Sequence, residues 1–128
     1  MKNVILFCSD HFGALSQCIA LTDTYRNSCR IIFLTSTDDK EQIACLEELK
    51  RKGVFEYTLY DYRFLCNETE KSVLFNEVVA YFDRILLSLS VELDSIRKIY
   101  LCNSGAYTPF GLYLTQKSLN YSVVEFAR

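Results

Sequence analysis

The chain has 128 residues, the size of one ordinary domain, which argues against a complete two-domain enzyme within it. Half of the residues are hydrophobic, 23% are charged, and there are only four glycines and one proline, which excludes long disordered, collagenous and low-complexity segments. Fourteen basic and sixteen acidic residues give a net charge of −2, so no basic surface is available and a nucleic-acid partner is not expected.

The first expected element is a strand over residues 3–8. An apolar run follows Lys2 and Asn3 but stops at Asp10, short of the roughly 7 to 15 apolar residues of a signal peptide. The longest uncharged stretch, residues 99–116, contains Asn103, Ser104 and Pro109, which argue against a bilayer span. The sequence therefore predicts a cytoplasmic protein.

Ser9 or Asp10 can cap a helix over residues 11–26, and Asn27 is expected to stop it in a left-handed conformation. A second strand follows over residues 30–35. The next helix is predicted to begin at Asp38, with Glu41 as its capping-box partner, and to end at Gly53. The apolar positions of these two helices are Leu15, Cys18, Ile19, Thr22, Tyr25, Ile43, Leu46 and Leu49.

Residues 54–60 alternate, which is typical of an edge strand with one wet face. Residues 61–70 are expected to be irregular and to lead into a long helix over residues 71–93. A fourth strand, residues 98–102, precedes a loop that ends in Thr108 and Pro109, a helix cap and first-turn proline, so a helix to about residue 120 is expected. The fifth strand is predicted over residues 121–126. The apolar stripe of the long helix is Phe75, Val78, Val79, Phe82, Ile85, Leu86 and Leu89; together with Tyr81 its aromatic residues are interpreted as core or interface. The two faces of residues 54–60 are Phe55, Tyr57 and Leu59 against Glu56, Thr58 and Tyr60.

Five strand–helix steps without a linker predict one α/β domain, a Rossmann-like three-layer αβα fold. Continuous apolar strands require helices on both faces of a parallel sheet, and right-handed crossovers favour five strands in the order 3-2-1-4-5. In that order the sheet reverses between the first and fourth strands. The loops after Cys8 and Cys102 are therefore expected to open a ligand-binding crevice.

Six cysteines occur without a CxxC pair, regular spacing or an export signal, so free structural thiols are expected and a zinc or other metal site is not. They are Cys8, Cys18, Cys29, Cys45, Cys66 and Cys102.

The first rim of the expected crevice comprises Ser9, Asp10, His11, Phe12 and Gly13. Backbone N–H groups at a helix start favour an anion or a sugar hydroxyl, and Gly13 permits close approach. His11, with an ordinary pKa of about 6.5, could act beside Asp10 as a general base. The alternative is that Ser9 or Asp10 only caps the helix and that His11 is a surface residue.

The second rim offers neutral hydrogen-bonding groups and an aromatic ring, suited to a hydroxyl or carbonyl ligand. The alternative is a turn and a helix cap that need no ligand. Glu125, at the end of the fifth strand, is the third catalytic candidate, or else a strand-end charge in water. The second rim consists of Asn103, Ser104, Gly105, Ala106, Tyr107 and Thr108.

Several other site types fit poorly. Gly13 stands alone after the first strand and no GK[ST] motif occurs, so dinucleotide and P-loop sites are excluded. A phosphoreceiver domain requires two acids after the first strand, an aspartate after the third and a lysine after the fifth. The sequence offers Asp10 and Asp61 but lacks the second acid and the lysine.

Residues 2–9 (KNVILFCS) and 98–103 (KIYLCN), with a later strand ending in an acid, resemble the N-terminal domain of bacterial GT-B glycosyltransferases. The resemblance is strongest to lipooligosaccharide sialyltransferases and capsule polysialyltransferases and spans the whole chain. It implies that this domain holds a glycan acceptor, while a second domain binds a CMP- or UDP-sugar and carries a His-Pro motif that this chain lacks. No cofactor is expected in this domain.

In those families an acid-acid-glycine motif supplies the base that deprotonates the acceptor, and residues 125–127 (EFA) match it through Glu125 alone. Other GT-B enzymes place a base after the first strand, where Asp10 and His11 lie. The resemblance thus implies the N-terminal half of a surface-polysaccharide glycosyltransferase, specifically a sialyltransferase, inactive alone and completed by a C-terminal domain beyond Arg128. The resemblance is also compatible with peripheral membrane association of the full protein and with a homodimer.

The alternative is a non-catalytic flavodoxin-like or receiver-like binding module. A gene continuing for about 150 to 250 residues would favour the enzyme, and one stopping at Arg128 would favour the module. A flavin-mononucleotide protein is a third reading, but Asp10 would repel its phosphate.

Overall fold

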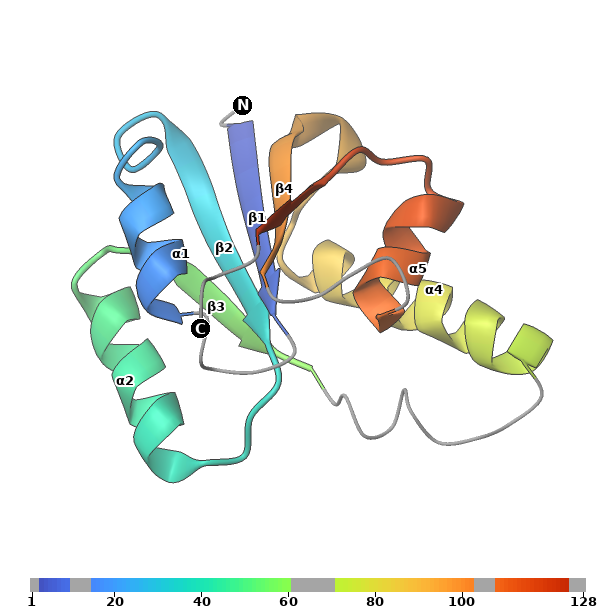
Figure 1. Cartoon of the computed structure of the whole chain (residues 1–128), viewed down its shortest axis with the longest axis horizontal. Helices are drawn as coiled ribbons and strands as arrows, with labels where there is room; N and C mark the ends of the chain where they lie inside the picture. The colour runs from blue at the N-terminus through green and yellow to red at the C-terminus, as the bar shows by residue number, and fades with distance from the viewer. Residues whose placement is uncertain (1–2, 10–14, 61–70, 103–107, 125–128) are drawn as a thin grey trace.

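Five parallel strands form one sheet in the order β3-β2-β1-β4-β5, with helices on both faces (Figure 1). The computed structural model describes residues 3–9, 15–60, 71–102 and 108–124. The predicted α/β class, parallel sheet and strand order are confirmed. The strands are β1 (Asn3–Ser9), β2 (Cys29–Thr35), β3 (Glu56–Leu59), β4 (Ile96–Cys102) and β5 (Ser122–Val124).

Strand β1 lies at the centre of the sheet because its side chains from Val4 to Cys8 are apolar on both faces and almost fully buried. Its register with β2 runs without interruption from Asn3, opposite Cys29, to Ser9, opposite Thr35. The register with β4 shifts once, between Val4 and Ile5. Strands β1 and β2 therefore end level with each other at the carboxyl edge.

The helices form two separate layers. Helices α1 (Leu15–Thr22) and α2 (Lys40–Arg51) cover one face of the sheet, and α4 (Lys71–Ser88) and α5 (Pro109–Gln116) cover the other (Figure 1). The short 3-10 turn η2 (Leu93–Ser95) leads into β4. Right-handed crossovers produce this division, because the chain moves in one direction from β1 to β3 and in the other from β4 to β5. No helix in the described ranges is both long enough and apolar enough to cross a bilayer.

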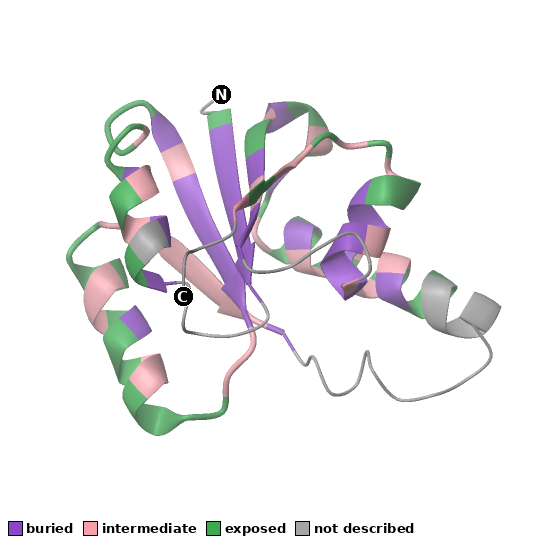
Figure 2. Ribbon diagram, viewed as in Figure 1, coloured by how far each residue is buried: buried purple, intermediate pink, exposed green. Residues whose placement is uncertain are grey.

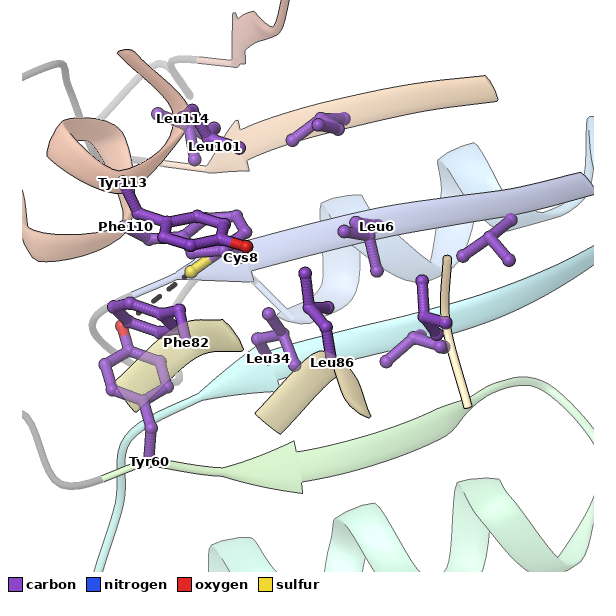
Figure 3. Packing of buried hydrophobic residues seen from close by; sticks show 14 of the residues in the cluster. Leu6, Cys8, Leu34, Tyr60, Phe82, Leu86, Leu101, Phe110, Tyr113 and Leu114 are labelled. Carbon is purple, nitrogen blue, oxygen red and sulfur yellow. Dashed lines mark hydrogen bonds between the residues drawn. The ribbon is translucent and has the colours of Figure 1, made fainter. Parts of the chain in front are cut away.

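Each layer buries its own hydrophobic core against the sheet, whose strands β1 and β2 are almost entirely buried (Figure 2). The α4/α5 core, part of which is drawn in Figure 3, consists of Val4, Leu6, Cys8, Ile32, Leu34, Tyr60, Val78, Phe82, Leu86, Val91, Ile99, Leu101, Phe110, Tyr113 and Leu114. The α1/α2 core consists of Ile5, Phe7, Leu15, Cys18, Cys29, Ile31, Phe33, Leu46, Phe55 and Cys102.

Helix α1 ends at Thr22, whereas the prediction extended to residue 26. The Thr22 hydroxyl donates to the carbonyl of Ile19 at 2.6 Å, and hydrogen-bonded turns then carry the chain to β2. Asn27 does not adopt the predicted left-handed conformation. The prediction was wrong because these turns, in which Tyr25 accepts from the N–H of Cys29, reverse the chain without a positive φ.

Helix α2 is capped by Asp39 and not by Asp38, and Glu41 does not complete a capping box. The Asp39 carboxylate accepts from the N–H of Gln42 at 3.0 Å, while the N–H of Asp39 donates to the Thr37 hydroxyl at 3.1 Å. The N–H of the observed cap residue, Asp39, is thus satisfied by Thr37, two residues upstream, and not by a capping-box side chain.

The predicted stop of α2 at Gly53 is confirmed. Gly53 has a φ of +76° and donates to Lys50, and Val54 donates to Leu49, which is a Schellman motif. The same motif ends α4 and α5, but with serines of φ 56° in the left-handed position, Ser90 and Ser118. These two helices therefore stop before the predicted residues 93 and 120.

Strand β3 lies at the edge of the sheet as predicted, with Phe55 in the α1/α2 core. Its other face is not simply wet, because Tyr60, which directly follows the strand, is buried against Phe82 of α4. The predicted exposure of Tyr60 was wrong for this reason: α4 crosses to the same face and covers it.

Five cysteines in the described part of the chain are free thiols, as predicted, and four of them are buried. Cys45 is exposed on α2, and Cys66 lies outside the described residues.

Candidate functional site

The strand order reverses between β1 and β4, as predicted, although all strands run parallel. These strands are neighbours in the sheet, with Cys8 opposite Leu101. The chain leaves β1 for α1 on one face and leaves β4 for α5 on the opposite face. A switch point of this kind is where open α/β sheets bind ligands, outside the carboxyl ends of the strands.

Ser9 is the last residue of β1 and is fully buried. Its carbonyl accepts a hydrogen bond from the Tyr60 hydroxyl at 3.4 Å, and Tyr60 in turn accepts from the Cys8 thiol at 3.8 Å. Figure 3 shows the Cys8 and Tyr60 side chains meeting beside Phe82 on the α4/α5 face. The end of β1 is therefore held to the end of β3 by a buried tyrosine.

Thr108 begins α5 in the predicted way. Its backbone is extended, and its hydroxyl accepts from the N–H of Gly111 at 3.2 Å, with Pro109 in the first turn. The helix-cap reading of Thr108 is thus correct. The other predicted site residues lie outside the described residues: Asp10, His11, Gly13, Asn103, Ser104, Gly105, Ala106, Tyr107 and Glu125.

Thr35 is a polar residue at this edge that sequence reasoning missed. It is the last residue of β2, lies opposite Ser9, and is fully buried, yet its hydroxyl has no hydrogen-bond partner among the residues that the structure describes. Strand alternation puts the side chains of Ser9 and Thr35 on the face of Phe7 and Phe33, which is the α1/α2 face. The signal available in the sequence was a hydroxyl residue ending each of two neighbouring apolar strands.

The thiols of Cys18 and Cys102 lie in contact near the same carboxyl edge of the sheet. The sulfur of Cys18 in α1 lies 3.2 Å from the sulfur of Cys102 at the end of β4, and both residues are fully buried. The hydrogen bond to Cys102 and burial raise the pKa of the Cys18 thiol. Cys18 is therefore an uncharged thiol at neutral pH and is not an activated nucleophile.

An open hollow of about 480 Å³ lies at the opposite, amino edge of the sheet, beside the starts of β2 and β3. Two of its cations are already paired: Arg30 holds Glu56 through two hydrogen bonds of 2.5 and 2.7 Å, and Arg26 lies 2.9 Å from Asp23. Because these charges are neutralised within the chain, we assign the candidate site to the carboxyl edge, where the topology reverses, and not to this hollow.

No protein-family model matches the sequence, and a search of curated proteins finds no match. Among solved structures, the chain is similar to LpCGTa, whose crystal structure was determined in complex with UDP. The TM-score is 0.62 at 12% sequence identity, over 98% of this chain and 30% of LpCGTa. The chain therefore spans about 30% of the length of that protein, and the shared feature is the fold.

The strand order separates this fold from one of the predicted alternatives. Flavodoxin-like and receiver domains have the order 2-1-3-4-5, whereas this sheet has the order β3-β2-β1-β4-β5. The fold is Rossmann-like, consistent with the similarity to LpCGTa.

Proposed function

We propose that this chain is a domain of a GT-B glycosyltransferase and that it holds a glycan acceptor at the carboxyl ends of β1 and β4. The observation that carries the proposal is the match of nearly the whole chain to one part of LpCGTa, a glycosyltransferase solved with UDP. The resemblance of residues 2–9 and 98–103 to bacterial sialyltransferases points to the same class.

The location of the site follows from the strands. Since β1 and β4 are adjacent and the helices that follow them lie on opposite faces, the segments that follow Ser9 and Cys102 in the sequence begin at the switch point of the sheet. These segments carry Asp10, His11, Ser104 and the other predicted acceptor-binding groups. The buried Thr35 hydroxyl adds an unused hydrogen-bonding group beside Ser9.

The proposed reaction is an inverting displacement. One of Asp10, His11 and Glu125 acts as the base and takes the proton from a hydroxyl of the glycan acceptor. The oxygen of that hydroxyl attacks the anomeric carbon of the nucleotide sugar, and the nucleotide leaves with its phosphate. The nucleotide sugar, a CMP- or UDP-sugar, is bound by a second domain. Transfer of sialic acid during synthesis of a bacterial surface polysaccharide or lipooligosaccharide, on the cytoplasmic side of the membrane, is the specific form of this proposal.

A transfer assay tests the proposal. The protein expressed from its complete gene is supplied with CMP-sialic acid or with UDP-sugars and with oligosaccharide acceptors. We expect transfer from one donor class, and we expect one of Asp10→Asn, His11→Gln and Glu125→Gln to lower kcat by about 100-fold or more. Lys50→Ala, at the hollow on the opposite edge, is the matched control and should leave kcat unchanged. Absence of both transfer and nucleotide-sugar binding would refute the proposal.

A further inference from the structure

Two cysteine side chains, those of Cys18 and Cys102, lie in direct contact in the core. Their sulfur atoms are 3.2 Å apart, although the residues are 84 positions apart in the sequence. One comes from the middle of α1 and the other from the carboxyl end of β4, and both belong to the α1/α2 core. A disulfide has a sulfur–sulfur distance of about 2.05 Å, so a shift of little more than 1 Å would join them.

The other described cysteines differ from this pair. The thiol of Cys8 donates to Tyr60 on the opposite face of the sheet, which Figure 3 shows. The sulfur of Cys29 contacts Ser28 and the guanidinium of Arg97, and Cys45 is exposed on α2. Among the cysteines that the structure describes, the direct sulfur–sulfur contact shown is therefore the one between Cys18 and Cys102.

We propose that Cys18 and Cys102 form a reversible oxidation site that a hydroperoxide converts into a disulfide. One thiol loses its proton and its sulfur attacks a peroxide oxygen, which breaks the O–O bond and leaves a sulfenic acid and water. The second thiol then displaces the sulfenic hydroxyl as water and forms the S–S bond. Two thiols and one hydrogen peroxide give one disulfide and two waters, so the sulfur pair loses two electrons and the peroxide gains them.

The disulfide would connect α1, which follows β1, to the carboxyl end of β4, the two sides of the switch point. Helix α1 follows β1, and Cys102 ends β4, so the bond would tie the first rim of the proposed acceptor site to the second. The raised pKa of Cys18 predicts slow oxidation at neutral pH and faster oxidation as the pH rises, because the thiolate is the attacking form. This inference depends on the two sulfurs alone and is independent of the proposed function.

The experiment treats the whole chain with hydrogen peroxide at pH 7 and at pH 8.5, blocks remaining thiols with N-ethylmaleimide in denaturant, and measures the intact mass. We expect the mass of two hydrogens to be lost, two fewer maleimide adducts, and reversal by dithiothreitol. The melting temperature of the oxidised chain should be roughly 10 °C higher, since the bond closes a long loop. Digestion that cleaves before Asp10 separates Cys8 from Cys18, so the cross-linked peptides identify the pair in the wild-type chain.

Cys18→Ser and Cys102→Ser should each abolish the loss of two hydrogens. Cys8→Ser, which removes another buried thiol close by, is the matched control and should retain it. The proposal is overturned if all wild-type thiols stay reactive with maleimide, if the cross-link joins any other pair, or if it persists without Cys18 or Cys102. The peptide map of the wild-type chain decides the question even if a serine variant does not fold.

Discussion

The two faces of the sheet are packed with different kinds of side chains. On the α4/α5 face the helices supply large rings: Phe82 of α4 contacts both Phe110 and Tyr113 of α5, with ring centroids 5.0 and 5.6 Å apart. Across the same contact, the Tyr113 hydroxyl donates to Asp83 at 2.7 Å, and Lys117 lies 3.1 Å from the same carboxylate. These two helices are locked to each other as well as to the sheet.

On the α1/α2 face the rings come from the sheet side of the core: Phe33 of β2 stacks on Phe55, the residue just before β3, with ring centroids 5.4 Å apart. The helices contribute the smaller side chains of Leu15, Cys18 and Leu46 to the core. This face also holds the thiol pair and, by strand alternation, the unpartnered Thr35 hydroxyl. The α4/α5 face is thus held together mainly by contacts between aromatic side chains of its helices, whereas the α1/α2 face places the Cys18–Cys102 pair and the Thr35 hydroxyl next to the proposed site.

We expect the largest effect from a substitution that removes the aromatic contact between α4 and α5. Phe82→Ala should lower the free energy of unfolding by about 4 kcal/mol, because removal of a fully buried ring that contacts four other rings leaves a cavity. Leu46→Ala, equally buried on the other face, should lower it by about 3 kcal/mol. Urea denaturation of both variants measures the difference, and a larger loss for Leu46→Ala would contradict the comparison.

The next effect concerns tyrosine ionisation. Burial, and then the hydrogen bond to Asp83, raise the pKa of Tyr113. Burial, and then the hydrogen bond to Tyr25, raise the pKa of Tyr100 to about 12. Since a raised pKa stabilises the folded state while the phenol is protonated, this stability is present below pH 10 and is lost as the pH rises toward 12.

We expect a loss of about 1 kcal/mol for Tyr100 between pH 10 and pH 12, after allowance for its partial exposure. Absorbance of tyrosinate, followed in the wild-type chain, Tyr100→Phe and Tyr113→Phe, identifies the late transitions. Each variant should lack one of them. Ionisation of all tyrosines near pH 10 in the folded chain would contradict the assigned burial.

An effect of similar size but opposite sign is expected at Thr35. Thr35→Val removes a buried hydroxyl that has no partner and should raise the free energy of unfolding by about 1 kcal/mol. Thr22→Val is the matched control: Thr22 is also fully buried, but its hydroxyl bonds to Ile19, so this variant should not be stabilised. If Thr35 contributes to acceptor binding, Thr35→Val also weakens acceptor affinity, which calorimetric titration with the acceptor measures.

The smallest effect concerns the helix ends. Ser90→Gly and Ser118→Gly should each stabilise the chain by about 0.5 to 1 kcal/mol, since glycine adopts the observed φ of 56° without a steric penalty. Gly53→Ala, at the corresponding position after α2, should destabilise by a similar amount. Thermal melts of the three variants check the signs, and destabilisation by either glycine would contradict the Schellman assignment.

Much of the fold was predictable from local patterns. Uninterrupted apolar runs identified β1 and β2, Thr108 with Pro109 identified the start of α5, and Gly53 identified the end of α2. Local patterns failed at α4 and α5, because serine is not a residue from which a left-handed helix stop is expected. The position of the candidate site followed from the strand order, while Thr35 was missed because its burial depends on several elements.

The order of apolar strands and amphipathic helices was enough to determine a parallel Rossmann-like sheet and the point where it reverses, because side-chain periodicity and crossover handedness act locally along the chain. Three features depend on the packing of distant elements: α4 covers Tyr60, Thr35 has no hydrogen-bond partner in the described part of the chain, and Cys18 lies against Cys102. Each of these depends on groups from different elements, up to 84 residues apart, whose positions are set by packing and not by neighbouring sequence.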